Sequence, residues 1–89
     1  MLKTKKGFIM RKLATEYMVV AVGDAADDFN GMIQLNETGA FLWERLEKGT
    51  EMEALIKDIM DTFENIDEQT ARKDVGLFLE EVAVAIQEL

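Results

Sequence analysis

The sequence contains no cysteine, histidine, proline or serine. Without cysteine the chain can form neither a disulfide framework nor a thiolate metal site. Nucleophilic triads, zinc sites and histidine acid–base catalysis also lose their usual side chains. Carboxylates, lysines, threonines and one tyrosine remain, but a solvated carboxylate is not a catalyst without a pocket that perturbs its pKa. We therefore expect a protein with no catalytic residues, no metal site and no cofactor.

The chain also lacks an apolar stretch near the ~20 residues that span a bilayer. No secretory leader is apparent, because the N-terminal lysines precede a strand-like stretch and no small-residue cleavage site follows. A cytoplasmic protein that does not enter the membrane is expected. Its 89 residues, 48% of them hydrophobic, suit one globular domain spanning residues 1–89.

Positive charge is scarce and concentrated at one end. The formal net charge is −8, yet residues 1–12 carry five basic side chains and no acid, so the rest of the chain sums to −13. Nucleic acids bind through Lys and Arg, and an acidic body repels their phosphates. No nucleic-acid partner is expected. We interpret the basic end as a solubilising segment before an edge strand, where lysine discourages aggregation, with an interaction arm as the alternative.

Three β-rich segments occupy the first part of the chain, at Phe8–Leu13, Tyr17–Val22 and Met32–Leu35. Ala14-Thr15-Glu16 fits a short hairpin connection between the first two. The stretch Gly23–Gly31 reads as a polar loop. Short links between successive strands predict an antiparallel meander.

Three helices are expected to follow. The first runs from about Glu37 to Lys48. The second is indicated by Thr50 with Glu53 three residues later, the pattern of a capping box. The third begins near Asp67, a good N-cap, and is expected to continue almost to Leu89. The result is an α+β, winged-helix-like domain in which a three-stranded antiparallel sheet precedes three helices.

The third helix has a continuous apolar stripe when it is drawn with 100° per residue. The stripe consists of Val75, Phe78, Leu79, Val82, Ala85, Ile86 and Leu89. Leu77 and Val84 fall together on the opposite side, where they are either stray surface residues or part of a partner contact. The acidic Glu80, Glu81 and Glu88 would favour a basic or amphipathic partner.

Two other patterns do not support a ligand site. Asp24, Asp27 and Asp28 form the densest carboxylate cluster, but Ala26 occupies a position where a calcium-binding loop needs an oxygen ligand. The glycines form neither a GxGxxG nor a Walker-type array, so a phosphate cradle is not expected.

Residues 35–43, Leu-Asn-Glu-Thr-Gly-Ala-Phe-Leu-Trp, form the most informative motif, and Gly49-Thr50 ends it. Asn36 is expected to cap the helix, Glu37 complements the helix dipole, and Gly49 is a plausible C-cap. Trp43 is expected in the core or at its edge, with its indole N–H bonded locally. With Asp28-Phe29-Asn30-Gly31-Met32 before it, the motif resembles the pyrroloquinoline quinone biosynthesis protein D (PqqD) family.

This resemblance implies a fold of three antiparallel strands followed by three helices. It also implies a non-catalytic peptide chaperone, which binds the leader of a ribosomally made precursor and presents it to a modifying enzyme, often a radical S-adenosylmethionine enzyme. The leader would add as a strand beside the third strand and lie against the third helix. Carried onto this chain by role, the binding residues would be Met32, Ile33, Gln34, Leu35, Lys73, Leu77, Glu80, Glu81 and Val84.

Two alternative functions remain open at this stage. An accessory or oligomerisation module could bury Leu77, Val84 and a sheet edge against a second copy, giving a weak homodimer where leader binding would leave a monomer. A winged-helix DNA-binding protein would share the topology but needs basic residues clustered on its recognition helix. Arg72 and Lys73 are the only cations expected on the third helix.

Overall fold

The central sheet is an antiparallel meander of three strands. In the computed structural model, which describes residues 1–89, β2 (Phe8–Leu13) pairs with β3 (Glu16–Ala21), and β3 pairs with β4 (Met32–Leu35). The expected order β2-β3-β4 is confirmed, and both outer strands are edges. The turn is shorter than predicted, Ala14-Thr15 alone, and Ala14 has a φ of 56°. Such positive φ values match the twist of a two-residue hairpin.

The segment between β3 and β4 is more ordered than the predicted polar loop. It contains a one-turn helix, α1 (Ala25–Asp28). Phe29, directly after this turn, packs against Phe8 of β2, with 5.9 Å between the ring centroids. The aromatic contact therefore ties the connection to the sheet.

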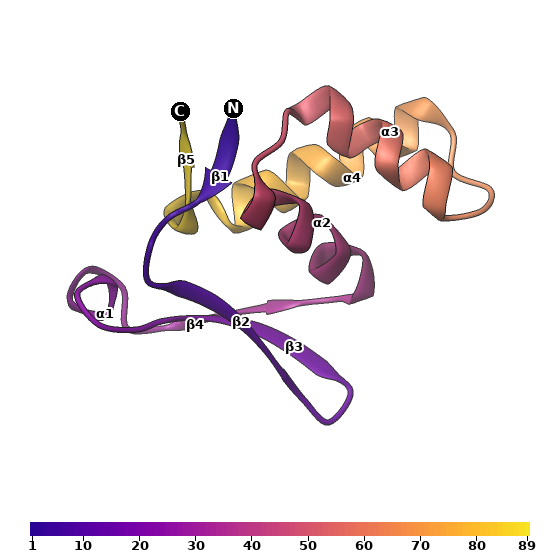
Figure 1. The fold of residues 1–89 in the computed structure, drawn as a ribbon. Coiled ribbons are helices and arrows are strands. Elements are labelled where there is room, and N and C mark those ends of the chain that lie inside the picture. Colours follow the sequence, from indigo (N-terminus) through magenta and orange to yellow (C-terminus); the bar gives the residue numbers. More distant parts are fainter.

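Three longer helices lie on one side of the sheet (Figure 1). They are α2 (Glu37–Lys48), α3 (Met52–Thr62) and α4 (Glu68–Glu81). The two predicted N-caps are confirmed: Asn36 Oδ1 accepts the Gly39 N–H at 2.7 Å, and Asp67 Oδ1 accepts the Thr70 N–H at 2.8 Å. Gly49 ends α2 with a φ of 91°.

The predicted capping box at Thr50 is wrong. Glu51 is the N-cap residue of α3, and no side chain caps this helix. Thr50 is instead held by a pair of backbone hydrogen bonds with Leu2, at 2.7 and 2.8 Å. This pairing takes Thr50 out of the position from which its hydroxyl could cap the helix.

The prediction that the last helix continues almost to Leu89 is also wrong. After Glu81 the chain forms a 3₁₀ turn (Ala83–Ala85) and then β5 (Ile86–Glu88), which pairs antiparallel with β1 (Leu2–Thr4). Figure 1 shows these two strands side by side, apart from the main sheet. Leu89 is consequently 63% exposed, and Val84 does not continue the helical face of Leu77.

The core lies between the helices and the inner face of the sheet. Its largest fully buried side chains are Trp43, Leu42, Leu46, Leu55, Ile59, Val19, Val75 and Val82. Trp43 is at the centre of this core and not at its edge, and its indole N–H has no hydrogen-bond partner. The expectation of a local partner for this N–H is therefore wrong.

Candidate functional site

β4 is an edge strand whose free backbone groups can be assigned from the hydrogen bonds of its neighbours. The Val22 N–H donates to the Gly7 carbonyl at 2.7 Å, in continuation of the β2–β3 ladder. Because hydrogen-bonded pairs alternate along an antiparallel ladder, Met18 and Val20 also bond toward β2. The residues of β4 that lie opposite them, Gln34 and Met32, then belong to non-hydrogen-bonded pairs of the β3–β4 ladder. The N–H and C=O groups of Met32 and Gln34 therefore point to the open side of β4.

The two edges of the sheet differ in charge. β2 carries Arg11 and Lys12, both exposed, and charged side chains protect an edge strand against pairing with another chain. β4 has the sequence Met-Ile-Gln-Leu and no charge. The edge formed by β4 thus lacks the protection found at β2.

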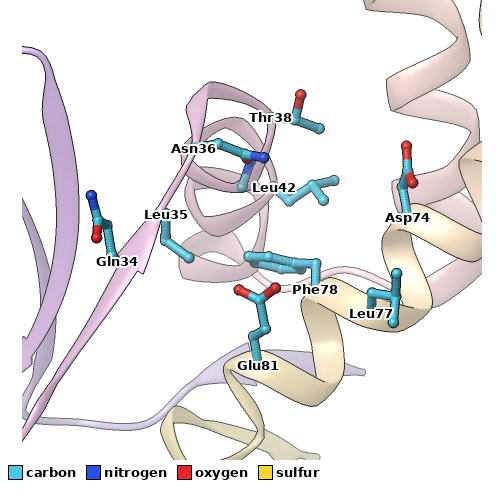
Figure 2. A pocket seen from close by; sticks show the side chains of 10 residues that line it. Gln34, Leu35, Asn36, Thr38, Leu42, Asp74, Leu77, Phe78 and Glu81 are labelled. Carbon is cyan, nitrogen blue, oxygen red and sulfur yellow. The ribbon is translucent and has the colours of Figure 1, made fainter.

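A cleft of about 500 Å³ lies beside β4, between the strand and α4. Figure 2 shows Leu35 of β4 on the side of the strand that faces Phe78 of α4, whereas the Gln34 side chain extends from the other side of the strand. The residues that line the cleft are Gln34, Leu35, Asn36, Thr38, Gly39, Leu42, Asp74, Leu77, Phe78 and Glu81. The cleft therefore combines an open strand edge, the first turn of α2 and one face of α4.

The motif at residues 35–39 shapes one wall of this cleft. Leu35 is buried at the end of β4, and Asn36 turns the chain into α2 by capping it. A Cβ at Gly39 would lie only 3.3 Å from both the Leu35 Cβ and the Asn36 Oδ1. Glycine at this position lets the first turn of α2 approach the strand closely, which leaves the cleft wall free of a side chain.

The opposite wall is apolar in its middle and acidic on either side. Phe78 is buried, and Leu77 is 50% exposed. Asp74 and Glu81 are the only charged residues that line the cleft, and neither forms an ion pair. An apolar side chain placed here would cover Leu77, and a cation would find two free carboxylates.

The structure brings only some of the predicted binding residues to the cleft. Gln34, Leu35, Leu77 and Glu81 line it, and Met32 and Ile33 belong to the same strand. The others, Lys73, Glu80 and Val84, do not line it. A peptide-binding role stays a prediction for every one of these residues.

Six lining residues were absent from the predicted set: Asn36, Thr38, Gly39, Leu42, Asp74 and Phe78. Helical spacing could have identified two of them. Asp74, Phe78 and Glu81 follow one another at intervals of four and three residues, which places them on one face of a helix. The other four lie on the α2 side of the cleft, and no local pattern shows that this turn faces α4.

Arg72 is directed away from the cleft by its ion pairs. Its guanidinium contacts Glu53 of α3 at 2.7 and 3.0 Å and Glu68 of its own helix at 3.1 Å. The hydrogen bonds that Arg72 donates to these carboxylates raise the pKa of Arg72, and they lower the pKa of Glu53. Arg72 thus joins α3 to α4 and does not neutralise Asp74, although it lies only two residues away in the sequence.

No three acidic side chains gather where they could hold a metal ion together. None of the helices is both long and apolar enough to cross a membrane.

Comparisons with known proteins identify the family. Two solved structures share the fold: "TbiB1 in Complex with the TbiA(beta) Leader Peptide" (TM-score 0.73, 20% identity, 91% of this chain and 87% of that one) and "Lasso peptide synthetase B1 complexed with the leader peptide" (TM-score 0.74, 13% identity, 98% of both chains). No match is found among curated proteins. The family model described as coenzyme PQQ synthesis protein D (PqqD) matches residues 16–85, which cover β3, β4, the cleft and all three long helices, so the chain belongs to the PqqD family.

Proposed function

We propose that this protein binds the leader segment of a ribosomally made precursor peptide as an extra strand along β4, and that it presents the peptide to a modifying enzyme. The observation that carries the proposal is the uncharged open edge of β4 beside a cleft with a half-exposed leucine. Family membership and the fold shared with two leader-peptide complexes support it.

The backbone of β4 offers part of the binding energy. Met32 and Gln34 each direct one N–H and one C=O outward, enough for four hydrogen bonds to an added strand. At 0.5–1.5 kcal/mol net for each bond, the ladder supplies roughly 2–6 kcal/mol. Association alone costs about 4–15 kcal/mol, so side chains of the peptide must bury apolar surface in the cleft to give measurable affinity. This requirement gives the Leu77 and Phe78 wall its role in the proposal.

The proposed role is that of a non-catalytic accessory protein acting in the cytoplasm, where ribosomal precursors are made. The partner enzyme would act on the part of the precursor that extends beyond the bound leader, often through radical S-adenosylmethionine chemistry in this family. DNA binding has little support, because Arg72 is engaged by two carboxylates and α4 carries four acids.

A second candidate function, self-association through β4, rests on the same open edge.

The test of leader binding is a ¹⁵N amide NMR titration with synthetic leader peptides from precursor genes that neighbour the gene for this protein. We expect peptide-dependent shifts at residues 32–35 and along the Asp74–Glu81 face of α4, with β2 unaffected.

The alternatives predict different responses. Shifts at β4 that follow protein concentration and not peptide would replace leader binding by self-association. Shifts confined to the basic segment at residues 3–12 would place the peptide elsewhere and refute strand addition at β4.

A further inference from the structure

The charge of the cleft defines the class of peptide it accepts. Asp74 and Glu81 are exposed, line the cleft, and have no cationic partner, whereas Glu68 on the same helix is paired with Arg72. No lysine or arginine lines the cleft. A bound peptide therefore meets two uncompensated carboxylates.

The two carboxylates flank an apolar strip. Seven residues separate Asp74 from Glu81, which places them on one face of α4 about 10 Å apart along its axis. Leu77 and Phe78 lie between them in the sequence and line the same cleft. Figure 2 shows the Glu81 side chain extending from α4 toward Phe78 and Leu35, with Asp74 farther along the helix. The wall that an added strand would face is thus acidic, then apolar, then acidic.

The first turn of α2 works in the opposite direction, and its effect is smaller. The N-terminus of a helix carries a partial positive charge of about half a unit. Here the Asn36 side chain already binds the Gly39 N–H, and Glu37 adds a negative charge in the first turn. Two full carboxylates outweigh what remains, so the cleft is negative.

We infer that the cognate leader carries a lysine or arginine two residues from a large apolar residue, both on the same face of the bound strand. Side chains two apart in a strand point to the same side and are about 6.6 Å apart. The apolar side chain would cover Leu77 and Phe78, and the long basic side chain would reach Asp74 or Glu81 on either side. This inference rests on the proposed function, because it takes the peptide to lie along β4.

The test is a selection from a displayed library of random 12-residue peptides, carried out on the folded protein and on two double variants. The first is Asp74→Asn with Glu81→Gln, which removes both cleft charges. The matched control is Glu47→Gln with Glu64→Gln, which removes two exposed, unpaired carboxylates outside the cleft. Circular dichroism melts check that all three proteins are folded.

We expect the native protein and the control to enrich peptides with a basic residue two positions from an apolar one. The cleft variant should retain the apolar preference and lose the basic one. For a synthetic enriched peptide, replacing the lysine by glutamate should weaken binding to the native protein about fivefold or more, and salt should reduce this difference.

Other results overturn the inference in distinguishable ways. Enriched peptides that bind at β4 without a basic preference, or with an acidic one, refute the charge assignment and leave the proposed function standing. The same basic preference in the cleft variant shows that other acids attract the peptide and also refutes it. If no peptide is enriched by any of the proteins, both the inference and the proposed function are wrong.

Discussion

Gln34→Pro is the substitution that most directly tests the free edge of β4. The alternation of the ladder places the Gln34 N–H on the open side of the strand, where it bonds to no other strand. Proline removes this donor and is tolerated on an edge strand when the lost N–H faced outward. The same change one residue earlier, Ile33→Pro, would remove a donor that faces Val19 of β3.

The expected effect on peptide binding follows from one broken hydrogen bond. The bond itself contributes about 0.5–1.5 kcal/mol, and the carbonyl of the peptide is left unpaired beside the proline ring, at a cost of about 1–3 kcal/mol. These two figures describe the same missing bond in part, so they are not added in full. We expect the binding free energy to fall by about 1.5–3 kcal/mol, which raises Kd roughly 10- to 100-fold. The free energy of unfolding should change by less than about 1 kcal/mol, since no bond within the protein is removed.

The assay pairs calorimetric titration of a bound peptide with urea denaturation of each variant. Gln34→Ala is the matched control, because it shortens the same side chain and keeps the N–H; its Kd should stay within about twofold of the native value. Ile33→Pro should unfold at much lower urea. A folded Gln34→Pro protein that binds like the native one would refute strand addition at β4, and an unfolded one would refute the assigned direction of the N–H.

Three further substitutions test the packing and the cleft. Trp43→Phe buries less apolar surface, which costs about 2 kcal/mol, but it also removes an unpaired N–H whose burial costs about 1–3 kcal/mol. The free energy of unfolding measured with urea should therefore change by only about 1 kcal/mol, whereas Trp43→Ala should lower it by about 3–5 kcal/mol. Asn36→Ala leaves the Gly39 N–H without its partner and should cost about 1 kcal/mol by the same measurement. Leu77→Ser should weaken peptide binding about fivefold in anisotropy titrations, whereas Leu13→Ser, at an equally exposed position on the other edge, should not.

Local chemistry accounts for the parts of the fold that the sequence predicts well. Asn36, Gly49 and Asp67 act within one helical turn of themselves, so their roles are legible without knowing the rest of the molecule. The meander is similarly local, because each strand pairs with the next one along the chain. The PqqD resemblance, which rests on this same region, is confirmed over residues 16–85.

The errors arise where distant segments compete for the same residues. Leu2 pairs with Glu88, near the other end of the chain, and no local pattern indicates such a contact. The apolar spacing at Val82, Ala85 and Ile86 suits a helix as well as the 3₁₀ turn and strand that form. Pairing with β1 decides between them. Thr50 is diverted in the same way, because its bonds to Leu2 replace the capping role that its sequence neighbours favour.

The cleft could be predicted only in part for the same reason. β4 was identified from its own residues, but Asp74 and Phe78 become wall residues only because α4 lies beside the strand and the first turn of α2. Lys73 and Glu80, which the sequence predicts as binding residues, each precede a wall residue by one position, Asp74 and Glu81 respectively. They therefore lie on another face of the helix. A one-residue error rotates a helical position by 100°, which is enough to move a side chain out of the cleft.

The charges of the two edges bear on the choice between leader binding and self-association. Arg11 and Lys12 discourage pairing at β2, whereas β4 is uncharged, so β4 is the edge at which another strand can pair more readily. A second copy paired there by a two-fold axis would bring its own Asp74 and Glu81 toward those of the first, inside a pair of molecules that each carry a net charge of −8. Like charges brought together in this way would oppose pairing, whereas a basic side chain of a peptide would neutralise them. If a leader binds along β4 as we propose, the same two carboxylates would disfavour a second copy and favour a cationic peptide, so we expect this edge to select one kind of strand.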